Sequence, residues 1–341
     1  MKAVVYERTG PPDVLQVREV EMPSPKKGEV IVKVAFSGVN PTDWKLRSGL
    51  TALGPLQFPQ VVPNQDGSGT ITAVGEGVDP NRVGQRVWIW EAAHQRPSGT
   101  AQEFTALPSD HAQELPDGVS FEVGASVGVP ALTAHRCLTL AENGPRILDK
   151  GALEGFTVLV HGGAGAVGHA AIQLAHWAGA RVITTVSSPE KAALATAAGA
   201  DHIVNYKTQD VTNEISAIAK NGVDIVLEVA PIKNLELDRV LLRPNGTIAI
   251  YANDGDQLTI PIRASMAPNL NYRFIMLYTI PTEAKQHAIT GVNKALRDDV
   301  LKVGEENGLP LHFFTLDQTR EAHIAVEKGI TGKVLIKVND N

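Results

Sequence analysis

The sequence predicts an α/β protein in which a doubly wound parallel sheet is joined to a β-rich domain. From residue 157 onward, short β-branched segments alternate with helical patterns, as they do in parallel sheets with right-handed crossovers. Residues 1 to about 120 are instead strand-like and turn-rich. The chain has 341 residues, of which 43% are hydrophobic and 20% charged, so it is long enough for two hydrophobic cores.

The N-terminal part reads as an all-β unit because clusters of glycine and proline separate its β-branched segments. Strands are expected over residues 2–7, 15–20, 29–35, 69–74 and 86–90. A helix is expected over residues 123–140. A last strand over residues 333–338 is expected to rejoin the β-rich unit, which would then contain both ends of this sequence.

The central part shows the alternation in full. Strands are expected over residues 157–160, 181–186, 202–205, 224–229, 247–251 and 274–279. Helices are expected between them, over residues 170–178, 192–198, 211–219 and 235–242. This order of elements predicts a doubly wound sheet.

The stretch TVLVHGGAGAVG, residues 157–168, is a strand, a tight glycine turn and the start of a helix. Gly163, Gly165 and Gly168 fit the G-x-G-x-x-G pattern of dinucleotide sites. In that pattern the first glycine makes the turn, the second lets amides approach a pyrophosphate, and the third allows close helix–strand packing. The helix N-terminus adds donors and a positive dipole end. A glycine-rich turn without a ligand is the alternative, but the flanking strand and helix favour a nucleotide site.

The end of the next strand indicates which nucleotide is bound. NAD-preferring sites place an acid there, on the ribose 2′-hydroxyl, and this sequence has none. It reads Ser187, Ser188, Pro189, Glu190, Lys191 instead. Hydroxyls and a cation suit a 2′-phosphate, so the sequence favours NADPH. Ser188 is also a good helix N-cap with Pro189 at the first helical position, and the two roles are compatible.

Charge and composition exclude several classes of protein. A net charge of −6 argues against a protein built around a nucleic-acid backbone. The sequence has no run of 18 apolar residues, and MKAVVYERTG lacks the apolar core of a signal peptide, so a cytoplasmic protein is expected. The single cysteine, Cys137, allows neither an internal disulfide nor a cysteine-based zinc cluster.

Motifs along the whole chain resemble the medium-chain dehydrogenase/reductase superfamily, and within it the zinc-free quinone oxidoreductases related to ζ-crystallin. Besides the glycine turn, they are GPPDVLQV at 10–17, GVNPTDWKLRSG at 38–49, DGSGTITAVGEGV at 66–78, VGQRV at 83–87, GADHIVNY at 199–206, GVDIVLEV at 222–229, PNGTIAIY at 244–251 and TGKVLIKV at 331–338. The resemblance implies a β-rich, GroES-like, partly open barrel domain from residues 1–123 and 265–341. It also implies a Rossmann domain from residues 124–264, with NADPH in the cleft between the two.

Zinc-dependent members of the superfamily bind their catalytic metal at three positions, which hold Asn40, Gln65 and Val129 here. None of these is a normal zinc ligand, because zinc takes thiolate, imidazole or carboxylate donors. His94 and His135 are isolated histidines and are read as surface or packing residues. A metal-free protein is therefore expected.

The resemblance also implies a set of cofactor residues with defined roles. Ala164 to Val167 would form the pyrophosphate turn, Ser187 and Lys191 would lie beside the 2′-phosphate, and Ile275 to Leu277 would back the nicotinamide unless they form a core strand. The full set is Thr133, Gly163, Ala164, Gly165, Ala166, Val167, Ser187, Lys191, Tyr206, Asn234, Tyr251, Ala252, Ile275, Met276 and Leu277.

The implied activity is NADPH-dependent reduction of a quinone by hydride transfer, by a homodimer or homotetramer. Candidates for the substrate pocket are Asn40, Asp43, Gln65 and Trp90; Trp44 and Trp88 are read as packing residues. Family members often carry a tyrosine after the RSG motif, where this chain has Leu50 and Thr51, so no proton donor is assigned. Two alternatives stay open: reduction of 2-alkenals or enones, and RNA binding as in some ζ-crystallin-like proteins, which the acidic charge does not favour.

Overall fold

The computed structural model describes residues 1–50 and 56–339. The chain forms two compact units: unit 1 contains Met1–Val129 and the segment from Leu311 onward, and unit 2 is Pro130–Pro310. These boundaries differ from the predicted ones, because residues 124–129 group with unit 1 and residues 265–310 group with unit 2. The reason for the second difference is that β13 (Asn271–Phe274) hydrogen-bonds to β12 (Leu242–Ile250) and so extends the sheet of unit 2.

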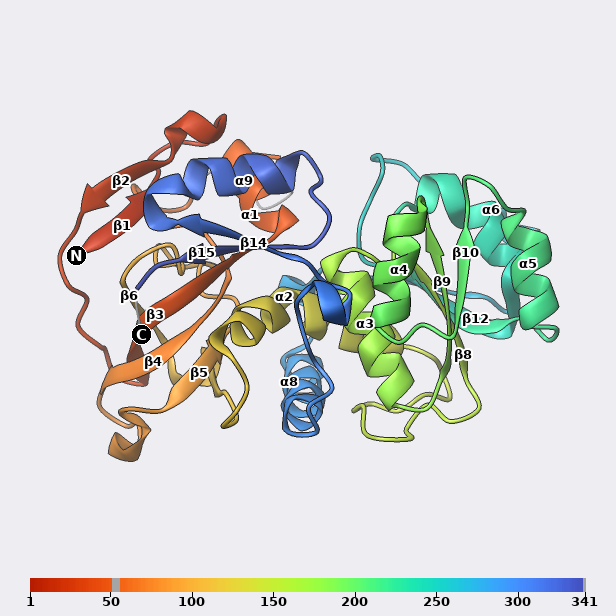
Figure 1. The fold of residues 1–341 in the computed structure, drawn as a ribbon, viewed down its shortest axis with the longest axis horizontal. Helices are drawn as coiled ribbons and strands as arrows, with labels where there is room; N and C mark the ends of the chain where they lie inside the picture. Colours follow the sequence, from red (N-terminus) through yellow and green to blue (C-terminus); the bar gives the residue numbers. More distant parts are fainter. Residues whose placement is uncertain (51–55, 340–341) are drawn as a thin grey trace. The chain divides into compact units, whose positions relative to one another are not determined.

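Unit 1 is built around a mainly antiparallel sheet. Among the described residues, the strand order is β14-β15-β3-β4-β5-β7, and β6 also pairs with β3 (Figure 1). The strands are β3 (Glu29–Val39), β4 (Asp66–Val74), β5 (Arg86–Ile89), β6 (Phe104–Pro108), β7 (Ala112–Glu114), β14 (Leu311–Thr315) and β15 (Lys333–Lys337). A separate hairpin joins β1 (Lys2–Val5) to β2 (Gln16–Glu19).

The long strand β3 organises unit 1. Its first half pairs with β6 and its second half with β15, both antiparallel. Register shifts against β4 interrupt the ladder, and irregularities of this kind let a strand bend. Buried side chains from β3, β4 and β5, such as Val30, Ile71 and Val87, form one core cluster. The expectation that the last strand rejoins the N-terminal unit is confirmed.

Unit 1 contains helices as well as strands. They are α1 (Pro41–Ser48), the first part of α2 (Phe121–Leu138) and α9 (Thr319–Glu327). Asn40 is the N-cap of α1, and its side chain and that of Asp43 form a reciprocal capping box. This cap fixes the turn that carries the sequence GVNPTD.

Unit 2 contains a parallel sheet in the order β10-β9-β8-β11-β12-β13 within the described chain (Figure 1). The first strands are β8 (Thr157–His161), β9 (Arg181–Val186), β10 (His202–Asn205) and β11 (Val223–Glu228). The crossover helices are α3 (Ala166–Trp177), α4 (Pro189–Ala197), α5 (Val211–Ile218) and α6 (Pro231–Leu241), followed by α7 (Ile262–Met266) and α8 (Thr282–Arg297). This is the doubly wound arrangement that the sequence predicts.

The strands of unit 2 read as apolar runs because helices cover both faces of a parallel sheet. Val158, Leu159 and Val160 of β8 are completely buried. The strand expected over 274–279 is wrong: β13 ends at Phe274, and Leu277–Thr279 form a short 3-10 helix. In the described residues, no helix combines the length and the apolar character that crossing a membrane requires.

Candidate functional site

The glycine turn between β8 and α3 requires glycine at positions 162, 163 and 168 for steric reasons. Gly162 has a φ of 71°, a left-handed conformation that favours glycine, so it makes the turn that the sequence analysis assigned to Gly163. A Cβ at Gly163 would lie 2.2 Å from the hydroxyl oxygen of Thr184 on β9. One at Gly168 would lie 2.4 Å from the Gly162 carbonyl oxygen. The turn can therefore pack this tightly only with glycine at these positions.

The start of α3 has the character of an anion site. Gly165 is its N-cap, and a Cβ there would contact only the Gly162 carbonyl oxygen, at 3.4 Å. Gly165 is also exposed, so a ligand can approach it. The first turn continues with Ala166, Val167 and Gly168, which are small and uncharged. The first amides of a helix lack intrahelical partners and carry the positive end of its dipole, so they can donate to phosphate oxygens.

The end of β9 lies beside this turn because β9 pairs with β8. Ser188 is the N-cap of α4, and its hydroxyl accepts a hydrogen bond from the Lys191 amide at 3.3 Å. The capping role of Ser188 is therefore present. Ser187 and the side chain of Lys191 are half-buried at the same edge of the sheet.

Most of the other predicted cofactor residues follow a strand of this sheet directly. Tyr206 comes after β10, Tyr251 and Ala252 come after β12, and Ile275 to Leu277 come after β13. Because the strands are parallel, all their carboxyl ends lie at one edge, where doubly wound sheets bind ligands. Ile275 and Leu277 are buried, whereas Met276 is 52% exposed.

The two predicted cofactor residues that remain, Asn234 and Thr133, also lie on helices. Asn234 is in the first turn of α6 and donates to Glu228 Oε1 at 3.2 Å. Thr133 is buried within α2.

A buried polar cluster lies directly beneath the glycine turn, and the sequence analysis missed it. His161, the last residue of β8, contacts Thr185 Oγ1 through Nδ1 and Asp238 Oδ1 through Nε2, each at 2.8 Å. Its Nε2 also lies 3.6 Å from Glu228 Oε2. Burial raises the pKa of Glu228 to about 8 and that of Asp238 to about 7, and it lowers the pKa of His161. Burial therefore opposes the charged form of each of these three groups.

A second buried polar network lies in unit 1 and contains three of the four substrate-pocket candidates. The Asp43 carboxylate accepts hydrogen bonds from the backbone amide of Asn40 at 2.7 Å and from the backbone amide of Gln65 at 3.1 Å. Asn40 Nδ2 donates to Asp66 Oδ2 at 2.7 Å, and Lys333 Nζ donates to Asn40 Oδ1 at 2.7 Å. Asn40 and Gln65 are at most 2% exposed. Both the nitrogen and the oxygen of the Asn40 side-chain amide are therefore hydrogen-bonded to other residues of the protein.

The charges of this network are an ammonium and two carboxyls. Lys333 Nζ lies 3.7 Å from Asp66 Oδ2, which also accepts from the Val129 amide at 3.0 Å. Burial raises the pKa of Asp43 to about 8, raises that of Asp66 and lowers that of Lys333. Sequence reasoning missed Asp66 and Lys333, although a lysine opening the apolar strand KVLIK was a visible signal.

Trp90, the fourth pocket candidate, lies apart from this network. Its ring stacks on His111 with centroids 4.3 Å apart, and its Nε1 donates to the Asp110 carbonyl oxygen at 3.1 Å. It is 3% exposed, as expected of a packing residue. Of the positions after the RSG motif, Leu50 is exposed, and Thr51 lies outside the described residues.

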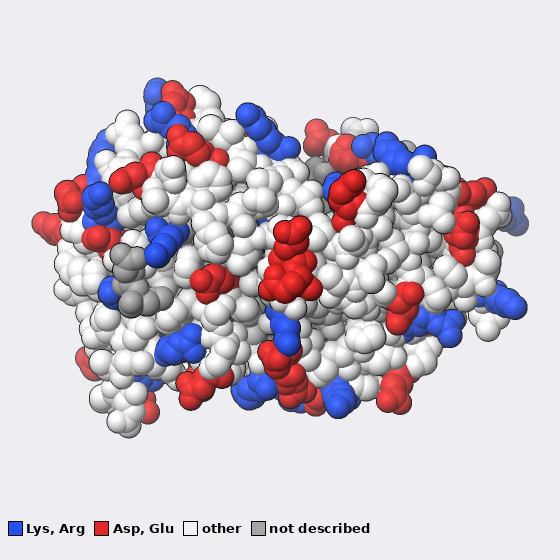
Figure 2. Space-filling view, in the orientation of Figure 1, with Lys and Arg blue, Asp and Glu red and all other residues white. Residues whose placement is uncertain are grey.

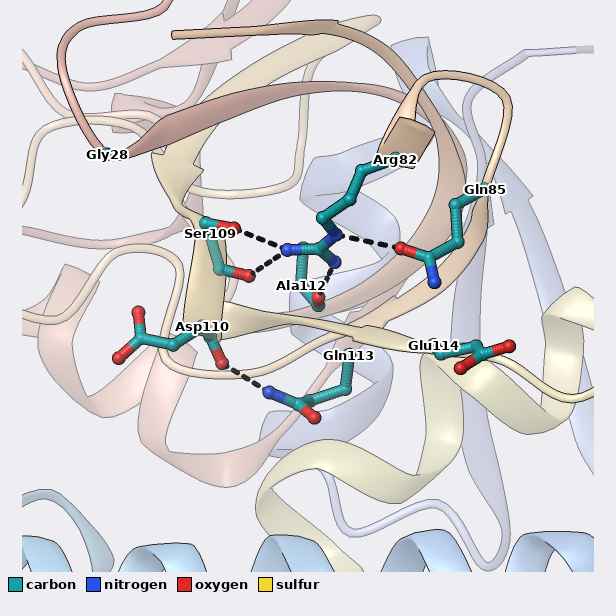
Figure 3. Close-up of a pocket in the computed structure, with 8 residues that line it drawn as sticks. All are labelled: Gly28, Arg82, Gln85, Ser109, Asp110, Ala112, Gln113 and Glu114. Carbon is teal, nitrogen blue, oxygen red and sulfur yellow. Dashed lines mark hydrogen bonds between the residues drawn. The ribbon is translucent and has the colours of Figure 1, made fainter. Parts of the chain in front are cut away.

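A pocket of about 460 Å³ lies elsewhere on unit 1 (Figure 3). It is lined by Gly28, Arg82, Gln85, Ser109, Asp110, Ala112, Gln113 and Glu114. The Arg82 guanidinium donates to Gln85 Oε1 and to the Ser109 carbonyl oxygen at 2.8 and 2.7 Å, and also to Ser109 Oγ and the Ala112 carbonyl oxygen. This arginine therefore holds loops together.

A dinucleotide-type turn on a doubly wound sheet, in a chain that also has a β-rich unit, defines a class of nicotinamide-dependent oxidoreductases. Family models agree: one described as "Zinc-binding dehydrogenase" matches residues 166–293, and one described as "Alcohol dehydrogenase GroES-like domain" matches residues 26–117.

Individual relatives narrow this class. The quinone oxidoreductase of Homo sapiens is 30% identical over 343 residues, covering 98% of this chain and 97% of that protein. A mycobacterial protein in complex with NADPH has a TM-score of 0.80 at 28% identity, over 99% of this chain and 100% of its own. An NAD-dependent alcohol dehydrogenase has a TM-score of 0.85 at 27% identity, with the same coverage. The chain therefore belongs to the medium-chain dehydrogenase/reductase superfamily, in the branch of the quinone oxidoreductases.

Proposed function

We propose that this protein reduces quinones with NADPH. The observation that carries the proposal is the pairing of the glycine turn with Ser187 and Lys191 at the end of β9, in a chain similar to quinone oxidoreductases over nearly its whole length. One similar structure holds NADPH and another is named NAD-dependent, so the residues at β9 decide the cofactor. An ammonium and a hydroxyl there favour the extra phosphate of NADPH.

The residues of unit 2 supply binding and orientation. When bound, NADPH supplies a hydride from its nicotinamide ring to the acceptor. The amides of Ala166 and Val167 bind the pyrophosphate, and Ser187 and Lys191 bind the 2′-phosphate. Tyr206, Asn234, Tyr251 and Ala252 flank the adenosine and ribose, whereas Thr133 and the segment from Ile275 to Leu277 contact the nicotinamide.

For the quinone we propose a supporting role for Asn40, Asp43, Gln65 and Trp90. All four are buried, and the hydrogen bonds described above join them to other residues of unit 1, so they hold the loops around the acceptor in place. The reaction needs little more from side chains, because hydroquinone oxygens take protons readily from solvent once the hydride has arrived.

The experiment that tests this function compares acceptors. Purified protein with NADPH is assayed against benzoquinones, naphthoquinones and simple enals under matched conditions. Reduction of an enal needs a proton placed on carbon, and no donor is assigned here. Turnover of quinones should exceed that of enals by at least about tenfold, or roughly 1.4 kcal/mol in barrier. Faster reduction of enals would replace the proposal with the alkenal reductase alternative.

We also propose that two copies of the chain form a homodimer through β13. The exposed edge of this strand favours a dimer over a tetramer. Among the described residues, β13 is the outermost strand of the sheet, and large apolar side chains are exposed on it and on α7: Phe274 at 67%, Ile262 at 73% and Met266 at 68%. An exposed strand edge beside apolar side chains is a surface that pairs with another chain. Light scattering should give a dimer mass, and Phe274→Asp should shift the protein toward monomer; an unchanged mass would contradict this interface.

Two further proposals concern location and RNA. We propose that the protein acts in the cytoplasm and does not depend on RNA. On the face drawn in Figure 2, positive and negative side chains are interspersed, which offers a phosphate backbone no continuous positive surface there. A salt-dependent titration with RNA should show no more than weak nonspecific affinity; tight binding would revive the RNA-binding alternative.

A further inference from the structure

The buried cluster beneath the glycine turn joins three elements of unit 2. His161 ends β8 and directly precedes Gly162, Glu228 ends β11, and Asp238 comes from α6. The side chains of Glu228 and Asp238 are completely buried. None of the roles proposed above involves these residues.

Each carboxyl uses one oxygen and leaves the other without a partner. Glu228 Oε1 accepts from the Ala230 amide and from Asn234 Nδ2, and Asp238 Oδ1 contacts His161 Nε2. Among the described residues, Glu228 Oε2 and Asp238 Oδ2 are buried with no hydrogen-bond partner. Buried unpartnered oxygens are costly, and one proton held between the two carboxyls satisfies both atoms.

The rest of the cluster is consistent with one carboxylic acid and one carboxylate. Burial raises the pKa of Glu228 to about 8, with a further rise from the Asp238 carboxyl beside it, and that of Asp238 only to about 7, so we assign the proton to Glu228 and the accepting role to Asp238. Asp238 can then accept a second hydrogen bond from His161 Nε2–H, and His161 Nδ1 accepts from the Thr185 hydroxyl. This assignment leaves the imidazole neutral.

We propose that Glu228 and Asp238 share one proton and that the cofactor's phosphates bind tightly only while this proton is held. The pair acts as a positioning element. Asp238 holds His161, which leads into the glycine turn, while Glu228 holds the loop at Ala230 and the side chain of Asn234. Loss of the proton would place a second buried negative charge beneath the anion site and leave two carboxylates facing each other. The inference rests on the proposed binding of NADPH.

The titratable groups around Glu228 are His161 from β8, Asp238 from α6 and Tyr251 after β12, with Cys137 of α2 near Tyr251. Burial raises the pKa of both Tyr251 and Cys137, so they stay neutral through the range in which the carboxyl pair titrates. Asp43 titrates in the same range but belongs to unit 1, so a variant of Glu228 is needed to separate the two.

The first test measures the Kd for NADPH from pH 6.5 to 9.5 by fluorescence titration. In the unmodified protein the Kd should rise about tenfold through pH 8, the loss expected when one pKa differs by a unit between free and bound protein. Glu228→Gln keeps a donor toward Asp238 and cannot lose it, so its Kd should stay within about threefold over the range. Glu214→Gln, at an exposed acid on α5, is the control and should keep the rise.

The outcomes separate the two proposals. A Kd in the unmodified protein that does not change with pH, or an equal rise in Glu228→Gln, would overturn the shared proton. Failure of the unmodified protein to bind NADPH at any pH would contradict the proposed function instead. Infrared spectroscopy without cofactor tests the proton directly. The C=O stretch of a protonated carboxyl should be present at pH 7, fade toward pH 9 and be weaker in Glu228→Gln. The same band intensity in both proteins would also overturn the inference.

Discussion

Each unit has a buried polar cluster that contains two carboxyl groups, and the two clusters balance their charge differently. In unit 1, Asp66 lies 3.7 Å from the ammonium of Lys333, and Asn40 links the two side chains. In unit 2, Glu228 and Asp238 face an imidazole whose pKa burial lowers, so a proton takes the place of the cation. The lysine side chain stays in its cluster even though burial lowers its pKa, whereas a shared proton leaves its cluster as the pH rises.

The lysine of unit 1 is therefore a fixed part of its cluster, whereas the proton of unit 2 can be gained or lost. Lys333 ties β15 to the N-terminal cap of α1 across 293 residues of sequence, and this link is structural. The carboxyl pair of unit 2 lies beneath the glycine turn, where a change of charge alters the affinity for an anion. Four measurements test whether the two clusters differ in this way.

Removing the fixed cation should have the largest effect. Lys333→Met leaves the buried Asp66 without its counter-charge and Asn40 Oδ1 without its donor. Breaking a buried ion pair costs about 3–5 kcal/mol, so the free energy of unfolding should fall by that amount in urea titrations. Lys328→Met, at an exposed lysine, is the control and should change little. A loss below about 1 kcal/mol for Lys333→Met would show that the lysine does not balance the cluster.

A lysine at the ligand surface of unit 2 should behave in the opposite way. Lys191→Ala should leave the unfolding free energy nearly unchanged and weaken NADPH binding about tenfold to a hundredfold, since a hydrogen bond to a charged group contributes about 1.5–3 kcal/mol. NADH binding, which lacks the 2′-phosphate, should change little. Calorimetric titrations with both cofactors check this, with Lys220→Ala as an exposed control. Equal losses for the two cofactors would remove Lys191 from the 2′-phosphate site.

The protonated pair should give unit 2 a stability that depends on pH. The pKa of Glu228 is about 8 in the folded chain, against an ordinary value of 4.5. Between these values the folded chain holds a proton that the unfolded chain has released, so the unfolding free energy falls as pH rises, by up to about 1.4 kcal/mol per pH unit. Urea midpoints at pH 5 to 8 should fall less steeply in Glu228→Gln. Asp43 and Asp238 keep part of the slope, because their pKa values are raised too. Identical slopes would contradict a proton on Glu228.

The smallest expected effect is that of removing metals. A bound metal would be a third way to balance buried carboxyls, and His161, Glu228 and Asp238 lie close enough to share one. The direct 2.8 Å contact of His161 with Asp238 occupies the position of such an ion. Dialysis against a strong chelator should therefore change neither turnover nor stability, and elemental analysis should find well under one zinc per chain. A stoichiometric zinc needed for either property would refute metal independence.

The sequence predicts most of the fold because its apolar segments have the length and spacing of strands. The strands over 181–186 and 202–205 have the predicted bounds. The prediction over 274–279 failed because the run after Phe274 is apolar, while β13 itself, with Asn271 and Arg273, is an outer strand under little constraint from burial. The domain boundary shifted for the same reason, since the sequence does not indicate which sheet that strand joins.

The candidate site, like the fold, was predicted from the sequence only in part. Gly163, Gly165 and Gly168 are visible in the sequence because they form a local pattern of fixed spacing, in which sterics require glycine at positions 163 and 168. The buried cluster was not visible, because His161, Thr185, Glu228 and Asp238 come from different elements and share no spacing. Folding brings them together, and only then does their common burial change their protonation.

The pairing of β15 with β3 sets an order of events during synthesis. Unit 2 is continuous in sequence and can fold as soon as it leaves the ribosome, but the edge of β3 from Phe36 to Val39 has to await β15. Asn40 and Lys333 are 293 residues apart, which corresponds to about 15–60 s of translation. For that time the nascent chain carries an open strand edge and an incomplete core in unit 1. The period of greatest exposure to aggregation and to chaperones is therefore set by the chain's connectivity.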